Sequence, residues 1–134
     1  MNNQKVLWVV DDDDIYKYSI NRALKTTDLA SKIITFSNGE EAILFMIENL
    51  NQNENLPDII FLDINMPIMD GFQFMEEYIK IKPRVGKKIT IYMVSSSIDK
   101  ADINKAKSIS EISDYLIKPI RPEELANLLT NFDV

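Results

Sequence analysis

The sequence predicts an α/β domain with a doubly wound, five-stranded parallel sheet and five helices. Five short apolar runs alternate along the chain with segments whose apolar residues follow a helical period. Polar residues do not alternate with apolar ones inside these runs, which is typical of parallel strands buried on both faces. Because strands and helices alternate, each strand should connect to the next through a right-handed crossover.

The apolar runs place the expected strands at residues 5–10, 32–36, 58–62, 89–94 and 114–117. The periodic segments place the expected helices at residues 15–26, 38–50, 72–81, 99–107 and 121–132. Asn38 and Asp99 stand where N-caps are favoured, and Pro122 stands at the first helical position of the last helix. No repeat or linker divides the chain, so we expect residues 1–134 to form a single domain with no second one.

The composition disfavours several classes of function. The chain has 21 acidic and 15 basic residues, a formal net charge of -6, and no basic stripe, so direct nucleic-acid binding is disfavoured. No apolar run is long enough to span a membrane, and the N-terminus lacks the pattern of a signal peptide. We therefore expect a cytoplasmic protein without membrane insertion.

Two residue types are absent from the chain, namely Cys and His. Their absence excludes thiolate nucleophiles, Ser-His-Asp triads and zinc sites built from Cys or His. A bound metal would have only oxygen ligands, which favours Mg²⁺, Mn²⁺ or Ca²⁺.

Polar side chains of three chemical kinds follow four of the five expected strands. They are Asp11 and Asp12 after the first strand, Asp63 after the third, Ser95 after the fourth and Lys118 after the fifth. In an open parallel sheet the carboxyl ends of the strands share one edge, where ligands bind. Two carboxylates about 4 Å apart repel by roughly 4 kcal/mol at an effective dielectric near 20, and a divalent cation reverses that interaction. A lysine and a hydroxyl opposite the metal would suit a phosphoryl group.

Each of these residues also has an ordinary structural explanation. The Asp run could be a solvated helix start, Asp63 a turn residue, Lys118-Pro119 a strand-to-helix turn, and Ser95–Ser97 a polar loop. Their joint occurrence at strand ends favours a functional site. Within the tract of four aspartates, we expect Asp13 to face solvent in the loop and Asp14 to be the N-cap of the first helix.

Four motifs, "VVDD", "LDINMPIMDG", "MVSSS" and "YLIKP", occur in this order over residues 5–132. Together they resemble the receiver domain of bacterial response regulators, and the chain is most similar to single-domain regulators of the chemotaxis type. The resemblance implies a flavodoxin-like fold with strand order 2-1-3-4-5 and a receiver without an output domain.

The resemblance also implies a phosphoacceptor site that needs Mg²⁺, with Mn²⁺ as a substitute. Asp63 corresponds to the phosphoacceptor. Asp12 corresponds to a direct metal ligand, Asp11 to a ligand acting mainly through a metal-bound water, and Asn65 to a ligand through its backbone carbonyl. Asp63 itself belongs to the same metal site.

The remaining motif residues correspond to parts of the family's signalling machinery. Ser95 corresponds to the switch hydroxyl, Lys118 to the lysine that pairs with a phosphoryl oxygen, and Tyr115 to the aromatic switch. The positions of Asn65 and Ser97 tune the lifetime of the phosphoryl group. The Lys118-Pro119 peptide bond is expected to be cis.

The resemblance implies a signalling function rather than an enzymatic one, limited to self-catalysed phosphoryl transfer and slow autodephosphorylation. The donor would be a sensor histidine kinase or a histidine phosphotransfer protein, because this chain contains no His. The signal would pass to an unknown protein target through the face formed by residues 99–107, 114–117 and 121–132. We expect a monomer or a weak, phosphorylation-dependent dimer, and a role as intermediate receiver in a multistep phosphorelay is the alternative.

Two other classes of protein share parts of this pattern. A Mg²⁺-dependent phosphatase with an Asp nucleophile usually has a second Asp two residues later, where this chain has Asn65. A flavodoxin-like nucleotide binder needs a loop rich in Ser, Thr or Gly after the first strand, where Asp11–Asp14 would repel a phosphate in the absence of a metal.

Overall fold

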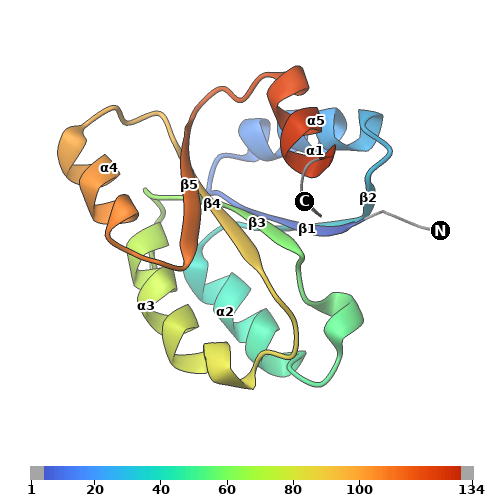
Figure 1. Ribbon diagram of the computed structural model, residues 1–134, viewed down its shortest axis with the longest axis vertical. Coiled ribbons are helices and arrows are strands. Elements are labelled where there is room, and N and C mark those ends of the chain that lie inside the picture. Colours follow the sequence, from blue (N-terminus) through green and yellow to red (C-terminus); the bar gives the residue numbers. More distant parts are fainter. Residues whose placement is uncertain (1–4, 131–134) are drawn as a thin grey trace.

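The computed structural model describes residues 5–130 and contains the predicted five-stranded parallel sheet (Figure 1). The strand order is β2-β1-β3-β4-β5, which confirms the order expected from the sequence. The strands are β1 (Lys5–Val10), β2 (Ala30–Phe36), β3 (Ile59–Asp63), β4 (Thr90–Ser95) and β5 (Ile112–Ile117). The helices are α1 (Asp14–Thr26), α2 (Gly39–Glu48), α3 (Gly71–Ile81), α4 (Lys100–Lys107) and α5 (Pro122–Thr130).

The two edge strands begin earlier than the apolar pattern predicted. β2 begins at Ala30 rather than at residue 32, and β5 begins at Ile112 rather than at residue 114. Both strands lie at an edge of the sheet and expose polar residues at their starts. An edge strand has one open side, so hydrophobicity does not mark its first residues.

Alternate residues of the central strands point to two separate hydrophobic cores. Trp8 and Val10 belong to the core on the side of α2 and α3, whereas Leu7 and Val9 belong to the core on the side of α1 and α5. Figure 1 shows these two helix pairs on opposite faces of the sheet. This arrangement leaves the carboxyl ends of the strands free at one edge.

The helix starts follow the expected capping chemistry with one exception. Asn38 and Asp99 cap α2 and α4, and α5 begins at Pro122. The prediction that Asp14 caps the first helix is wrong. The N-cap is Asp13, whose Oδ1 accepts from the backbone N–H groups of Ile15 (2.9 Å) and Tyr16 (3.1 Å).

The two polar connections at residues 51–57 and 82–88 lie against each other. Each contains one turn of 3₁₀ helix, Asn53–Asn55 and Lys82–Arg84. Lys87 joins the two connections, because its Nζ donates to the carbonyl of Leu56 (2.9 Å) and lies 3.1 Å from Oδ1 of Asp58. None of the helices within residues 5–130 is long and apolar enough to cross a membrane.

Candidate functional site

Three aspartates meet at the carboxyl edge of the sheet. Asp11 and Asp12 directly follow β1, and Asp63 is the last residue of β3. Each offers a carboxylate oxygen within 4.8 Å of the others. Asp11 and Asp63 are only 1% and 7% exposed, whereas Asp12 is exposed to solvent. The structure therefore brings together the three carboxylates that the sequence singled out.

Lys118 brings a positive charge to the same place from the far end of the chain. Its Nζ lies 2.6 Å from Oδ2 of Asp11 and 3.4 Å from Oδ1 of Asp63. The backbone N–H of Lys118 donates to the carbonyl of Ser95, which extends the β4–β5 pairing to this residue. The Lys118-Pro119 peptide bond is cis, as expected.

Burial and mutual repulsion perturb the titration of this site. Burial raises the pKa of Asp63, and the charge of Asp11 raises it further, so that it reaches about 6 although Lys118 acts in the opposite direction. Burial alone would lower the pKa of Lys118, but the hydrogen bond to Asp11 and the charges of Asp63 and Asp11 outweigh it and raise that pKa. The carboxylates carry more negative charge than a single lysine neutralises.

These observations fit an oxygen-ligated divalent cation. The three carboxylates are close enough for one ion, and two of them are shielded from water, which strengthens their attraction for a cation. Asn65 lies just after β3 in an exposed loop, close in sequence to Asp63.

Ser95 and Tyr115 are joined through the backbone of Ser97. Ser95 ends β4, is 1% exposed, and its Oγ accepts from the backbone N–H of Ser97 (3.0 Å). The hydroxyl of Tyr115 on β5 donates to the carbonyl of the same Ser97 (2.9 Å). Ser97 also donates through Oγ to Asp102 of α4 (3.0 Å). One residue thus connects the site, the start of α4 and the middle of β5.

The chain is similar to a known protein family over most of its length. The model of the response regulator receiver domain matches residues 7–130 of the chain. The chain belongs to this family. The match confirms the resemblance inferred from the four motifs and covers nearly all the residues that the structure describes.

Solved receivers and curated relatives agree with this assignment. A two-component response regulator from Cytophaga hutchinsonii is 28% identical, with a TM-score of 0.83 over 95% of both chains. The receiver domain of the histidine kinase CKI1 from Arabidopsis thaliana, complexed with Mg²⁺ and BeF₃⁻, is 27% identical, with a TM-score of 0.81 over 96% of this chain and 89% of that one. A probable transcriptional regulator ycf27 from Pyropia yezoensis is 33% identical over 127 residues, which are 93% of this chain and 46% of that protein. The chain spans less than half the length of such curated relatives.

The loop after Asp63 is held tightly in this receiver domain. The backbone N–H of Gly71 donates to the carbonyl of Ile64 (2.8 Å), which closes the loop onto the start of α3. A Cβ at Gly71 would collide with the carbonyl oxygen of Asp63. Glycine is therefore required at this position, because its backbone packs directly on that of the candidate phosphoacceptor.

Sequence reasoning missed one residue of the receiver site, Tyr16. Its ring lies under the Lys118 ammonium, with Nζ 4.3 Å from the ring centroid. In the sequence it is one of two tyrosines, Tyr16 and Tyr18, in the segment that forms α1, and nothing local distinguishes it. The signal that reveals it is tertiary, since Lys118 lies 102 residues further along the chain (118 − 16).

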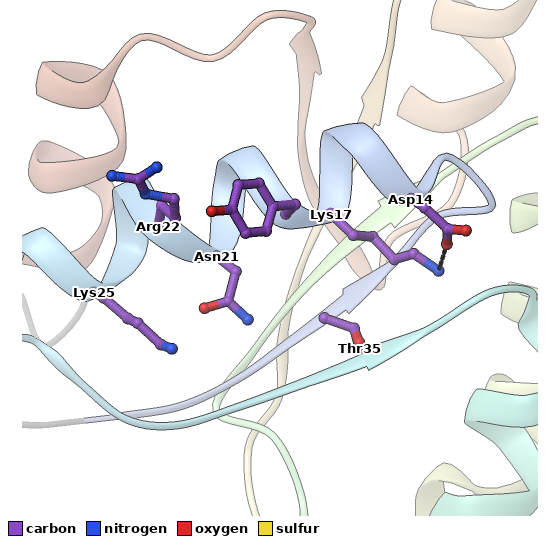
Figure 2. A pocket seen from close by; sticks show the side chains of 7 residues that line it. Asp14, Lys17, Asn21, Arg22, Lys25 and Thr35 are labelled. Atoms are coloured by element: carbon purple, nitrogen blue, oxygen red, sulfur yellow. Dashed lines mark ion pairs between the residues drawn. The ribbon is translucent and has the colours of Figure 1, made fainter.

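A separate hollow of about 350 Å³ lies between α1 and the edge strand β2 (Figure 2). It is lined by Asp14, Lys17, Tyr18, Asn21, Arg22, Lys25 and Thr35. Lys17 turns toward Asp14, at 3.3 Å from its Oδ1, and also donates to the Ser37 hydroxyl. None of the predicted site residues lines this hollow, which is therefore separate from the carboxylate cluster at the carboxyl edge of the sheet.

Proposed function

We propose that the chain is a phosphoacceptor module of a two-component system in which Asp63 receives the phosphoryl group. The observation that carries this proposal is the position of Asp63, which lies next to Asp11, Asp12 and Lys118 at the carboxyl edge of the sheet. Receiver domains are signalling modules of two-component systems, and this family membership supports the assignment.

In the proposed reaction, a carboxylate oxygen of Asp63 attacks the phosphorus atom of a phosphohistidine on a partner protein. The new P–O bond forms as the P–N bond breaks, and its electron pair returns to the imidazole of the donor. Phosphoryl transfer depends mainly on positioning and on neutralisation of the transferred charge. Lys118 provides one positive charge within reach of Asp63, and the low exposure of Asp63 limits competition from water.

The metal ligands would be Asp11, Asp12, Asp63 and the backbone carbonyl of Asn65. Mg²⁺ bound there would supply the remaining positive charge opposite Lys118, and Mn²⁺ would be an adequate substitute. The crowding of the carboxylates and the raised pKa of Asp63 support this ligand set. The Mg²⁺ and BeF₃⁻ in the complex of the CKI1 receiver support it by analogy.

We infer that the signal leaves through α4, β5 and α5. A phosphoryl group on Asp63 would accept a hydrogen bond from the Ser95 hydroxyl and draw its Oγ away from the Ser97 N–H. The Tyr115 hydroxyl donates a hydrogen bond to the carbonyl of Ser97, so a shift of Ser97 would change the bond that holds the Tyr115 ring in place. Exposed apolar residues near this route, Ile98 and Ile117, would contribute to binding an unidentified protein target.

The donor would be a sensor histidine kinase or a histidine phosphotransfer protein. Transfer from Asp63 onward to a phosphotransfer protein would make the chain an intermediate of a phosphorelay. We propose that the chemistry of the chain is limited to self-catalysed phosphoryl transfer and slow autodephosphorylation. Asn65 and Ser97 would tune the lifetime of the phosphoryl group on Asp63. We expect the protein to act in the cytoplasm as a monomer or weak dimer.

Intact mass spectrometry tests this function directly. Incubation with Mg²⁺ and a small phosphodonor such as phosphoramidate should add one phosphoryl mass to the wild-type protein and none to Asp63→Asn. Asp70→Asn, which changes the half-buried N-cap of α3, is a matched control and should be labelled like the wild type. Equal labelling of wild type and Asp63→Asn would refute the assignment, and rapid turnover of a generic phosphate ester would indicate a phosphatase instead.

A further inference from the structure

The ring of Tyr16 lies beneath the Lys118 ammonium. Tyr16 lies in the first turn of α1, and its ring packs partly buried against the core that contains Leu125. Lys118 Nζ lies 4.3 Å from the centre of this ring. At this distance the ammonium interacts favourably with the electron-rich face of the aromatic ring.

The Lys118 ammonium therefore has three contacts from three different elements. Asp11, which follows β1, accepts a hydrogen bond from the ammonium. Asp63 of β3 forms an ion pair with it, and the ring of Tyr16 on α1 lies beneath it. An ammonium has three N–H donors on a flexible stem, so several contacts are needed to hold it in one place. When a phosphoryl oxygen replaces a carboxylate oxygen as acceptor, the contact with the ring is the one that need not change.

The hydroxyl of Tyr16 is buried but has no hydrogen-bond partner among the residues that the structure describes. Leaving a buried donor unsatisfied costs about 1–3 kcal/mol, so such a group calls for an explanation. Burial raises the pKa of this phenol, and the charges of Asp11 and Asp63 raise it further. The hydroxyl is thus a protonated donor in the electrostatic field of the two buried carboxylates.

We propose that Tyr16 is a positioning residue of the phosphoryl site, whose ring seats Lys118 and whose hydroxyl donates a hydrogen bond to the phosphoryl group on Asp63. This inference rests on the function proposed above. It assigns a role to the buried hydroxyl, which gains its missing acceptor only when the site carries a phosphoryl group. It also gives the phosphoryl group a third donor, in addition to Lys118 and Ser95, which helps to shield the phosphoryl oxygens from water.

Two substitutions separate the ring from the hydroxyl. Tyr16→Phe keeps the ring and removes the donor, so labelling by phosphoramidate should proceed at nearly the wild-type rate while the aspartyl phosphate is lost roughly threefold to tenfold faster. Tyr16→Leu removes both, so labelling itself should also slow by about tenfold. The exposed Tyr18 of the same helix provides matched controls, and Tyr18→Phe and Tyr18→Leu should behave like the wild type.

A nuclear magnetic resonance measurement tests the ring without any phosphoryl transfer. An aromatic ring beneath Lys118 shifts the signals of the lysine methylene groups upfield, and these signals are assigned by their loss in Lys118→Arg. The upfield shift should persist in Tyr16→Phe and vanish in Tyr16→Leu. Tyr16→Met, which also lacks a ring, repeats the test should the leucine variant fail to fold.

The outcomes distinguish this inference from the function on which it rests. Failure of the wild-type protein to acquire a phosphoryl group on Asp63 would overturn the proposed function and the hydroxyl's role with it. A wild-type protein that is labelled, with Tyr16 variants that match the Tyr18 controls in both rates, would overturn only the role of Tyr16. An unchanged Lys118 signal in Tyr16→Leu and Tyr16→Met would show that the ring does not seat the lysine.

Discussion

Lys118 donates a hydrogen bond to the buried carboxylate of Asp11, with Nζ 2.6 Å from Oδ2. Asp11 belongs to the same cluster as Asp12 and Asp63, whose oxygens lie within 4.8 Å of one another. The lysine therefore shares the carboxylate that we assign to a metal ion. Two cations that share one carboxylate repel each other and compete for its oxygens.

Replacing Lys118 with Met should tighten Mg²⁺ binding by about twofold to tenfold, because it removes this competing charge. Isothermal titration calorimetry measures the change. Lys87→Met is the matched control, since Lys87 pairs with Asp58 outside the acidic cluster and should leave the affinity unchanged. Weaker Mg²⁺ binding in Lys118→Met would show that the lysine supports the metal site rather than competing with it.

The tract Asp11–Asp14 should respond to substitution in a graded way. Asp12→Asn should nearly abolish Mg²⁺ binding and Asp11→Asn should weaken it, because both lie in the carboxylate cluster. Asp13→Ala should lower the free energy of unfolding by about 1 kcal/mol through loss of the N-cap of α1. Asp14→Ala should change it much less, because that side chain is 93% exposed and makes a single ion pair. Metal titration measures the Mg²⁺ affinity of the four variants, and chemical denaturation measures their free energy of unfolding. Equal changes in all four variants would contradict this division.

The pKa of Asp63, about 6, predicts a pH-dependent penalty on stability in the absence of metal. Between pH 4 and 6, roughly, the native state binds more protons than the unfolded state, so the free energy of unfolding falls as the pH rises. Above pH 6 the full penalty remains. Asp63→Asn removes it and should stabilise the metal-free protein at pH 7.5 by at most about 3 kcal/mol.

Urea denaturation in the presence of a chelator measures this difference at several pH values. The gain of Asp63→Asn should shrink as the pH falls from 6 and disappear near pH 4, where the wild-type carboxyl is neutral as well. Excess Mg²⁺ should also reduce the gain in stability of Asp63→Asn over the wild type. A gain that is the same at pH 4.5 and 7.5 would mean that repulsion and burial of the Asp63 charge are not its cause.

Ile68 adopts a backbone conformation that is unfavourable for a β-branched residue. Its φ is 69°, in the left-handed region, and its side chain is 72% exposed in the loop after Asp63. Ile68→Asn and Ile68→Gly should each relieve this strain and raise the free energy of unfolding by about 1 kcal/mol. Thermal denaturation checks the gain, and Ile98→Asn is a control at an exposed position outside this loop. A loss of stability in both Ile68 variants would contradict the expectation.

The link through Ser97 predicts how a phosphoryl mimic should affect the amide spectrum. Beryllofluoride with Mg²⁺ should shift the Ser97 N–H resonance of the wild type, because the Ser95 hydroxyl leaves it for the mimic. The shift should persist in Tyr115→Phe and be lost in Ser95→Ala. A wild-type Ser97 resonance that does not move would show that Ser95 does not signal through this residue.

The sequence alone determined the architecture and most of the site. The apolar runs and helical periods are local patterns, and the rule that parallel strands share one carboxyl edge was enough to group Asp11, Asp12, Asp63, Ser95 and Lys118. Local patterns did not predict the starts of the edge strands, which are polar, or the N-cap residue within the aspartate tract. There the choice between Asp13 and Asp14 as N-cap depends on which residue leaves the helical conformation.

Only the tertiary structure decided which of these groups touch one another. The contacts of Lys118 with Asp11 and Tyr16, and of Tyr115 with Ser97, join residues of different elements that the crossovers bring together. Residue types and spacing place a side chain at the edge of a sheet, but they do not specify its distance from a group on another element. That distance depends on how the helices pack on the sheet, and it makes Tyr16 part of the site while Tyr18 of the same helix stays exposed to solvent.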